Sequence, residues 1–268
     1  MIIFDILPSG IVTQSGGTRK LTPRRLSRPW QQSKTTPESC SLCTTTEAII
    51  SAPPGWRVIL NPSTNYQNAI LIIPDACSFD LESVCEHWER SPGVVDIALK
   101  HMSERDTWLG IQVGGLAGGS VSHAHYHMVE PNNSSSIGVL GAEVFFRREL
   151  RRPSRHILSS GQCGAFTGGG RAGQCIILST GDSLAAHQDM ANTIAVILRL
   201  YSEKFRSHEG LTPEYQVGVA FANKRIRYAT VIPILAQPGF ADSMALLEGR
   251  EMPLGWSHEE TGNFLRNK

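Results

Sequence analysis

The amino-acid sequence predicts an α+β fold made of two tandem units with the same plan. Short apolar or alternating segments predict strands, and amphipathic segments with helical spacing lie between them. The order of these segments in the first half returns in the second, without strong residue identity between the halves. We expect an N-terminal strand and extended arm over 1–38, a first unit over 39–135 and a second unit over 136–268.

The first unit is expected to contain two strands, a broken helix and two further strands. The segments WRVIL and AILIIP flank a polar turn region and predict strands over 56–60 and 69–74. Residues 80–104 have helical spacing, and a Pro-Gly pair breaks this helix in two. TWLGIQV at 107–113 predicts the third strand, and a glycine-rich turn leads from it to the fourth.

The second unit is expected to contain a strand, a long helix and a hairpin. The predicted elements are a strand over 174–179, an amphipathic helix over 184–205, and a hairpin of 214–222 and 225–234 that turns at Asn223 and Lys224. The glycine-rich segment GQCGAFTGGGRAG before them predicts a loop.

Charge and hydropathy narrow the class of protein. The chain of 268 residues has 25 basic and 24 acidic residues, which gives no case for nucleic acid or an acidic membrane surface as partner. No apolar run approaches the roughly 18–20 residues that span a bilayer. The first residues carry Asp5 and no basic leader, so we expect no signal peptide. With six cysteines in no dense framework, we expect a reduced, cytoplasmic protein.

The segment GGSVSHAHYHMVE at 118–130 holds three histidines at alternate positions. Alternation predicts a strand, because successive side chains point to opposite faces of a sheet. One face then carries His123, His125 and His127. The other face carries the ordinary core residues Ala124, Tyr126 and Met128.

Three explanations of the histidines are open from the residues alone. They could be solvated surface side chains, they could bind one zinc or iron ion, or one of them could be a nucleophile that attacks phosphorus. Imidazole is largely neutral and nucleophilic at cell pH, and it leaves phosphorus readily. The preceding GLAGGS favours the third explanation, because glycine backbone approaches a phosphate closely and Ser120 adds a hydroxyl.

The segment GGSVSHAHYHMV resembles the signature of the histidine triad superfamily, His-x-His-x-His-x-x with apolar residues at x. The resemblance covers about residues 40–130. It implies that His125 is the nucleophile that takes a nucleoside monophosphate and that His127 contacts the reacting phosphate. It also implies an α+β, histidine-triad-like fold with an antiparallel sheet and packed helices. The implied substrate contacts are Ser120, the adjacent backbone at Gly119 and, on the nucleoside, Asn61.

Cys40 and Cys43 form a Cys-x-x-Cys pair that, alone, is half a zinc site, a redox pair or coincidence. The resemblance is to the branch of galactose-1-phosphate uridylyltransferases and dinucleoside polyphosphate phosphorylases, and the former carry such a pair at this place. It implies a structural, tetrahedral zinc site completed by His123 and by Cys77, which stands where that branch has a histidine, shifted by one residue. His87 is the competing third ligand.

Two departures from the uridylyltransferases bear on the activity. Their motif ends in His-x-Gln, whereas this chain has His127, as the hydrolases do, and this chain is shorter. The second unit resembles their second repeat but lacks a catalytic histidine pair, so it is expected to be degenerate. Its Lys224, Arg225 and Arg227 are either phosphate contacts or a solvated hairpin tip.

We therefore expect a nucleotidyltransferase or phosphorylase that acts at the α-phosphorus of a nucleotide or nucleotide conjugate through a nucleotidyl-histidine. The alternatives are a hydrolase of the same superfamily that cleaves phosphoanhydrides or phosphoramidates and, third, a metal-dependent enzyme with the triad as ligands. The resemblance also implies a homodimer, since the superfamily is often dimeric. The sequence leaves the nucleobase, the leaving group and the acceptor open.

Overall fold

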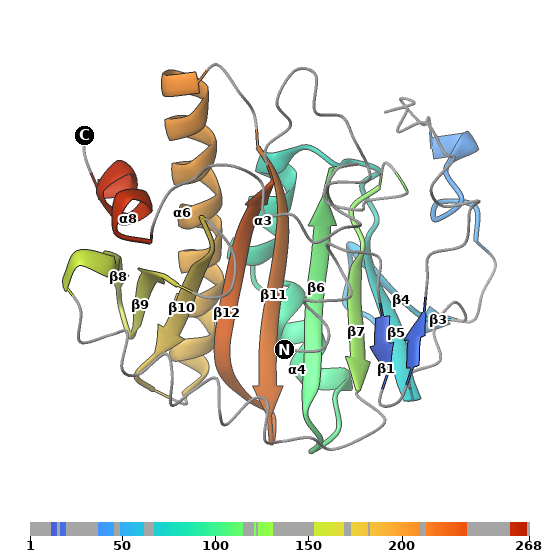
Figure 1. Ribbon diagram of the computed structural model, residues 1–268. Helices are drawn as coiled ribbons and strands as arrows, with labels where there is room; N and C mark the ends of the chain where they lie inside the picture. Colours follow the sequence, from blue (N-terminus) through green and yellow to red (C-terminus); the bar gives the residue numbers. More distant parts are fainter. Residues whose placement is uncertain are drawn as a thin grey trace.

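One antiparallel sheet of ten strands runs through both halves of the chain, in the order β3-β4-β5-β7-β6-β11-β12-β10-β9-β8 (Figure 1). The computed structural model describes residues 12–14, 17–19, 37–45, 49–61, 67–114, 121, 123–130, 153–168, 173–181, 183–209, 213–234 and 258–266. The sheet strands are β3 Ile49–Ile50, β4 Trp56–Leu60, β5 Gln67–Pro74, β6 Thr107–Val113, β7 Tyr126–Glu130, β8 His156–Ser160, β9 Cys163–Thr167, β10 Cys175–Ser179, β11 Glu214–Ala222 and β12 Arg225–Ile234.

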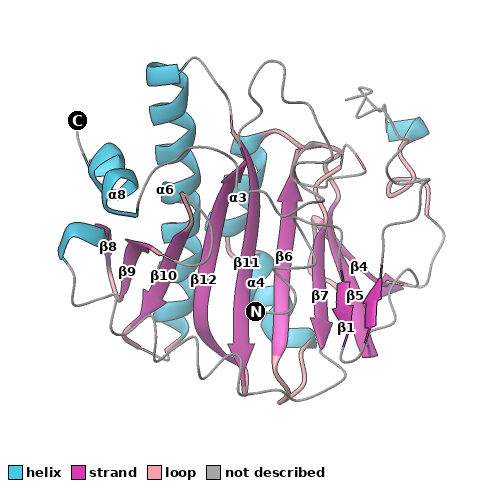
Figure 2. Ribbon diagram, viewed as in Figure 1, coloured by secondary structure: helices cyan, strands magenta, loops and turns pink. Residues whose placement is uncertain are grey.

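Helices cover one face of this sheet, and the main core lies between the two layers (Figure 2). They are α3 Leu81–Glu89, α4 Val94–His101 and the long α6 Leu184–Glu209, with α8 His258–Arg266 beside β8 and β9. Two 3-10 turns, Pro37–Ser39 and Pro153–Arg155, and a separate two-stranded sheet of β1 Val12–Gln14 and β2 Gly17–Arg19 complete the described elements. No helix in the described ranges is long and apolar enough to cross a membrane.

The two halves of the sheet have the same strand order. In the first half, β4 and β5 are followed by helices and then by β6 and β7, and the order in the sheet is β4-β5-β7-β6. In the second, β9 and β10 are followed by α6 and then by β11 and β12, and the order is β9-β10-β12-β11. The halves meet where β6 pairs with β11, with Gly110 opposite Gly218.

Most predicted elements are present. The predicted helix over 80–104 is two helices, α3 and α4, and the break lies at Pro92 and Gly93 as expected. Asp80 caps α3, because its carboxylate accepts a hydrogen bond from the Ser83 backbone N–H at 2.9 Å. Asn223 and Lys224 form the turn of the β11–β12 hairpin with φ of 51° and 58°, the left-handed backbone that tight hairpins require.

The prediction of a loop over 161–173 is wrong, because this segment contains strand β9. Cys163 and Ala165 point into the core and are buried. A side chain at Gly164 would meet the ring of Phe166 at 2.8 Å, so this glycine makes room for an aromatic ring within a strand. The glycine content of this segment therefore concealed a strand that directly follows the turn at Gly161.

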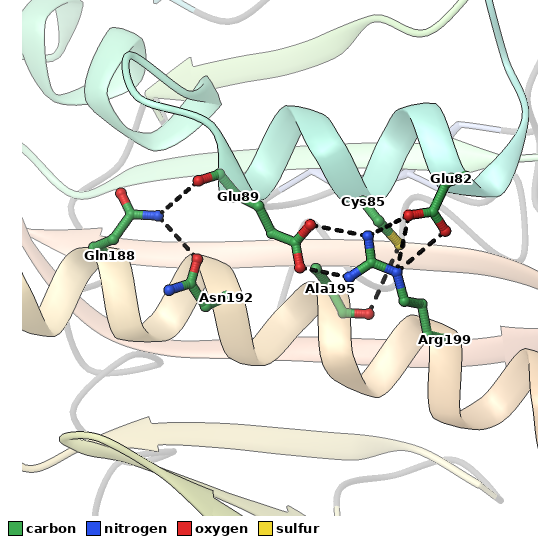
Figure 3. A network of polar contacts seen from close by, with 7 residues as sticks. All are labelled: Glu82, Cys85, Glu89, Gln188, Asn192, Ala195 and Arg199. Atoms are coloured by element: carbon green, nitrogen blue, oxygen red, sulfur yellow. Dashed lines mark hydrogen bonds and ion pairs between the residues drawn. The ribbon is translucent and has the colours of Figure 1, made fainter.

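An arginine network ties the helix layer of the two halves together (Figure 3). Arg199 on α6 donates to both carboxylate oxygens of Glu82 on α3, with Nε at 3.1 Å from each. Its Nη2 also donates to Glu89 at 2.9 Å. The hydrogen bonds from Arg199 lower the pKa of Glu82, which means that the charged pair is favoured in the folded protein.

Candidate active site and metal-binding cluster

The histidine segment lies at the centre of the first half, where β7 pairs with β5 and β6. Ala124, Tyr126 and Met128 are buried in the main core, as the alternating pattern predicts. The regular strand begins only at Tyr126, so the expectation of a strand through all three histidines is partly wrong. The backbone N–H of Ala124 instead donates to the Ser78 carbonyl at 2.9 Å, which ties this segment to the chain after β5.

His123 is completely buried and turns its ring toward thiols. Its Nε2 lies 2.8 Å from the Pro74 carbonyl oxygen. Because a carbonyl oxygen only accepts, Nε2 carries the hydrogen and Nδ1 keeps its lone pair. That Nδ1 lies 3.5 Å from Cys40 Sγ and 3.3 Å from Cys43 Sγ. A ring nitrogen held in this way, with a backbone carbonyl behind it, is typical of a metal ligand.

Cys40, Cys43, Cys77 and His123 form one cluster, whose ligand atoms all lie within 4.8 Å of one another. It is the only such group of metal-ligating side chains in the described part of the chain. Burial and the adjacent thiols of Cys77 and Cys40 raise the pKa of Cys43 to about 12. Three thiols this close do not ionise together without a cation, and a divalent metal would hold them as thiolates. Three sulfurs and one imidazole nitrogen fit zinc.

The elements around the cluster hold it in shape. The Cys40 carbonyl accepts from the backbone N–H groups of Cys43 and Thr44 at 3.0 and 3.1 Å, which closes the Cys-x-x-Cys turn. Arg57 on β4 donates to the Leu42 carbonyl at 2.8 Å and pairs with Asp75 at 3.4 Å. Arg57 thus joins this turn to the end of β5, a role for which the sequence holds no signal.

His87, the competing third ligand, lies outside the cluster. Its Nδ1 is 3.1 Å from the Tyr126 hydroxyl, and its ring lies 5.3 Å from the ring of Trp56. Burial lowers its pKa to about 4, so it is neutral at neutral pH. Of the two residues expected as third ligand, Cys77 is the one that lies in the cluster.

His125 presents its ring in one defined state. Its Nδ1 lies 2.8 Å from the His123 carbonyl oxygen and must donate to it. The lone pair of the neutral ring is therefore on Nε2. Burial lowers the pKa of His125, which keeps the ring neutral at neutral pH. An imidazole with a fixed Nδ1–H and a free lone pair on Nε2 is a nucleophile or a general base.

His127 lies beside His125, with the ring centroids 5.0 Å apart at 64°. Its Nδ1 is 3.3 Å from Nδ2 of Asn61, which directly follows β4. Asn61, expected as a nucleoside contact, is therefore next to the histidine pair. Opposite His127 in the sheet lie Leu71 on β5 and Gly110 on β6.

The structure places only some of the other expected residues. Gly119 and Ser120 lie outside the described residues. Lys224 and Arg225 are exposed at the tip of the β11–β12 hairpin. Gly218 on β11 pairs with Gly110 on β6, which in turn pairs with His127. Along β11, the tip of the hairpin lies about 17 Å beyond Gly218. The solvated hairpin tip is therefore the interpretation that the strand register favours.

Comparison with solved structures finds the fold, whereas comparison by sequence finds no family. No family model and no curated protein matches this chain. Among solved structures, an ADP-glucose phosphorylase from Arabidopsis thaliana with bound ADP-glucose is similar with a TM-score of 0.59 at 14% identity, over 92% of this chain and 94% of that one. A uridylyltransferase is similar with a TM-score of 0.55 at 13% identity, over 94% and 95%. A galt-like protein from Arabidopsis thaliana has a TM-score of 0.54 at 15% identity, over 79% and 83%.

These matches confirm the resemblance at the level of the fold. The chain has an α+β fold that is shared with the solved uridylyltransferase and ADP-glucose phosphorylase structures. One of the matched structures is named a uridylyltransferase, and another is an ADP-glucose phosphorylase with bound ADP-glucose.

Proposed function

We propose that this protein transfers a nucleoside monophosphate between a nucleotide and an acceptor, with His125 as the covalent carrier. The Nε2 lone pair attacks the α-phosphorus, and the bond from phosphorus to the leaving phosphate or sugar-phosphate oxygen breaks. The acceptor then attacks the same phosphorus, the phosphorus–nitrogen bond breaks, and the electron pair returns to Nε2. Two displacements replace one difficult step.

The observation that supports this most is the contact between His125 Nδ1 and the His123 carbonyl at 2.8 Å. It fixes both the tautomer and the direction of the ring, so that Nε2 is the reacting atom. A surface histidine has no such constraint. In a site that used the triad as metal ligands, His123 Nδ1 would face the other two histidines, whereas here it faces Cys40 and Cys43.

The surrounding residues are assigned by position. His127 is the proposed contact for the reacting phosphate, beside the nucleophile. Gly119 and Ser120 are the proposed phosphate contacts, and Asn61 lies on the nucleoside side of the same site. The substrate is a nucleotide or a nucleotide conjugate, for which the ADP-glucose held by one structural relative is a first candidate.

The proposed cofactor is one structural zinc ion held by Cys40, Cys43, Cys77 and His123. When bound, it supplies no chemistry to the substrate, because four protein ligands close its coordination. Its ligand His123 carries the carbonyl that orients His125. The cluster therefore braces the nucleophile from behind.

The proposed domain organisation is two tandem units, 39–135 and 136–268, after an arm over 1–38. The identical strand orders β4-β5-β7-β6 and β9-β10-β12-β11 support it. In the second unit Thr230 lies opposite Gly218, as His127 lies opposite Gly110 in the first. The second unit is therefore proposed to be degenerate.

The proposed assembly of the whole chain is a homodimer.

A hydrolase of phosphoanhydrides or phosphoramidates is the second candidate, because a histidine stands at 127 and the covalent step is the same. The two differ only in the acceptor. Turnover with water alone at the full rate would favour the hydrolase, and turnover that needs inorganic phosphate or a sugar phosphate would favour the transferase.

The test is intact-protein mass spectrometry of the full chain after brief incubation with single nucleotides. The panel is ATP, ADP-glucose, UDP-glucose, diadenosine tetraphosphate and an adenosine phosphoramidate. We expect the mass of one nucleoside monophosphate to be added by at least one of them. His125→Gly must lose the adduct, and His156→Gln, a matched change of a histidine on β8, must keep it. An adduct that persists in His125→Gly, or no adduct from any nucleotide, would contradict the proposal.

A further inference from the structure

Asn61 occupies a fixed place between strands β4 and β5 and the histidine pair. It follows β4 directly, and its backbone N–H donates to the Ala69 carbonyl on β5 at 2.9 Å. Its side chain is 7% exposed. From there its amide Nδ2 reaches Nδ1 of His127 at 3.3 Å. Two backbone strands thus set the position of an amide against one nitrogen of a catalytic-site ring.

This contact decides where the hydrogen of His127 sits. An amide nitrogen only donates, so Nδ1 of His127 must accept with its lone pair. A neutral imidazole has a single ring hydrogen, which is then on Nε2. His125 is in the opposite state, because its Nδ1–H donates to the His123 carbonyl and its lone pair is on Nε2. Adjacent rings, 5.0 Å apart, therefore present an Nε2 lone pair and an Nε2–H.

We propose that Asn61 is a positioning residue that fixes His127 in the Nε2–H tautomer, so that His127 donates a hydrogen bond to the phosphoryl oxygen while His125 attacks. The proposal rests on the proposed function for the identity of that oxygen. If the hydrogen of the neutral His127 ring were instead on Nδ1, Nε2 would turn a lone pair toward an oxygen that is gaining charge. A donor held in advance is what stabilises such an oxygen in the transition state.

The contact also separates the roles of the two rings. A doubly protonated His127 would set its Nδ1–H against the N–H of Asn61, and two donors repel. Asn61 therefore favours the neutral ring, which donates a hydrogen bond and keeps its proton. In this account His127 binds the transferring phosphoryl group in the transition state and does not protonate the leaving group.

The tautomer is measured directly by two-bond proton–nitrogen correlation NMR on the full chain with ¹⁵N-labelled histidine. The His127 signals are assigned by their loss in His127→Gln. We expect a pyrrole-type shift for Nε2 and a pyridine-type shift for Nδ1. The proposal is overturned if Nδ1 carries the hydrogen in the wild-type chain.

Substitution of Asn61 sharpens the test. Asn61→Asp replaces the amide with a carboxylate, which only accepts, so the hydrogen of a neutral His127 ring must move to Nδ1. Because a carboxylate also favours the doubly protonated ring, spectra and rates are recorded at a pH high enough to keep His127 neutral. Asn61→Leu removes the amide donor from Nδ1, so we expect the Nε2–H form of His127 to be less populated than in the wild type. Asn192→Asp on α6 is the matched control, because it introduces the same charge beside Gln188 on a helix. It should leave the His127 signals unchanged.

Rates then test the catalytic part. We expect Asn61→Asp to slow formation of the nucleotidyl adduct about 10²- to 10³-fold, the loss that follows removal of one oxyanion donor, with a smaller change in KM. A shifted tautomer with an unchanged adduct rate would overturn the role in catalysis. Failure of all nucleotides to form an adduct would refute the proposed function, whereas the NMR result on the tautomer would stand by itself.

Discussion

The two halves of the sheet share a strand order and differ in the residue that pairs with the matching glycine of the neighbouring strand, Gly110 in the first half and Gly218 in the second. In the first half His127 faces Gly110 across the strand pair, and in the second Thr230 faces Gly218. Thr230 is completely buried, donates to the Cys175 carbonyl at 3.1 Å and accepts from Gln174 at 2.9 Å. The Thr230 hydroxyl therefore has both its donor and an acceptor position in hydrogen bonds inside the fold. His127, at the matching place in the first half, instead lies beside His125, whose neutral ring has its lone pair on Nε2.

The cysteines differ in the same way. Cys40, Cys43 and Cys77 meet at one point in the first half. In the second half Cys163 is buried in the core and donates to the Ala186 carbonyl at 3.8 Å, and burial raises its pKa to about 11. The comparison teaches that one strand arrangement supports either a reactive site or plain core, and that the side chains behind the strand decide which.

The largest expected contrast is between His125 and Thr230. We expect His125→Gln to slow nucleotidyl transfer by about 10³-fold or more, because the covalent carrier is lost. Thr230→Val should leave the rate unchanged and lower the free energy of unfolding by about 1 kcal/mol, since Gln174 loses an acceptor. Steady-state kinetics and urea denaturation of both variants check this. A comparable rate loss in Thr230→Val would remove the functional distinction between the halves.

Metal content should follow the cysteines of the first half alone. We expect one zinc per chain in the wild type by elemental analysis, lost in Cys43→Ala and kept in Cys175→Ala. Removal of zinc should lower the free energy of unfolding by about 4 kcal/mol when free metal stands a thousandfold above its Kd. Full metal in Cys43→Ala would show that the cluster is not the site.

His87 should make stability depend on pH between its two pKa values. Burial lowers its pKa to about 4 from an ordinary 6.5, so the unfolded chain binds this proton first as pH falls. Stability should therefore decrease from pH 6.5 toward pH 4 by up to about 3 kcal/mol. Denaturation curves of wild type and His87→Gln at pH 7 and pH 4.5 test this, and the variant should lose this part of the slope. An equal slope in both would contradict the assignment to His87.

The smallest effect is expected at the Arg199 network between α3 and α6. Its groups are partly exposed, with 36% for the Arg199 side chain and 60% for that of Glu82. Arg199→Met should cost about 1 kcal/mol, less in high salt, because exposed ion pairs are screened. Glu203→Gln on the same helix provides a control for the change in charge. A loss that does not depend on salt would point to packing of the arginine stem instead.

The sequence predicted the parts of the fold whose pattern is local. The break at Pro92 and Gly93 and the hairpin turn at Asn223 depend on neighbouring residues, and both are present, whereas the alternating segment at 123–128 forms a regular strand only from Tyr126. Strand β9 was missed because Gly164 leaves space for the ring of Phe166, a packing requirement that composition does not reveal.

The candidate site was predicted as far as the family motif reaches. The resemblance predicted that Cys77 lies with Cys40, Cys43 and His123, and the structure brings these four residues together. Only the structure separates Cys77 from His87, which contacts Tyr126 instead. Arg57 and Asn61 act through contacts that join β4 to segments distant in sequence, namely Leu42 and His127. Such contacts depend on tertiary packing, so no spacing in the sequence indicates them.

The most direct test of the central claim is the stereochemical course at phosphorus. The nucleotide that forms the adduct is supplied with one α-phosphorothioate configuration, and the product configuration is read by ³¹P NMR. Two displacements through His125 predict net retention. Net inversion would mean that the acceptor attacks the nucleotide directly, and it would contradict the covalent role of His125.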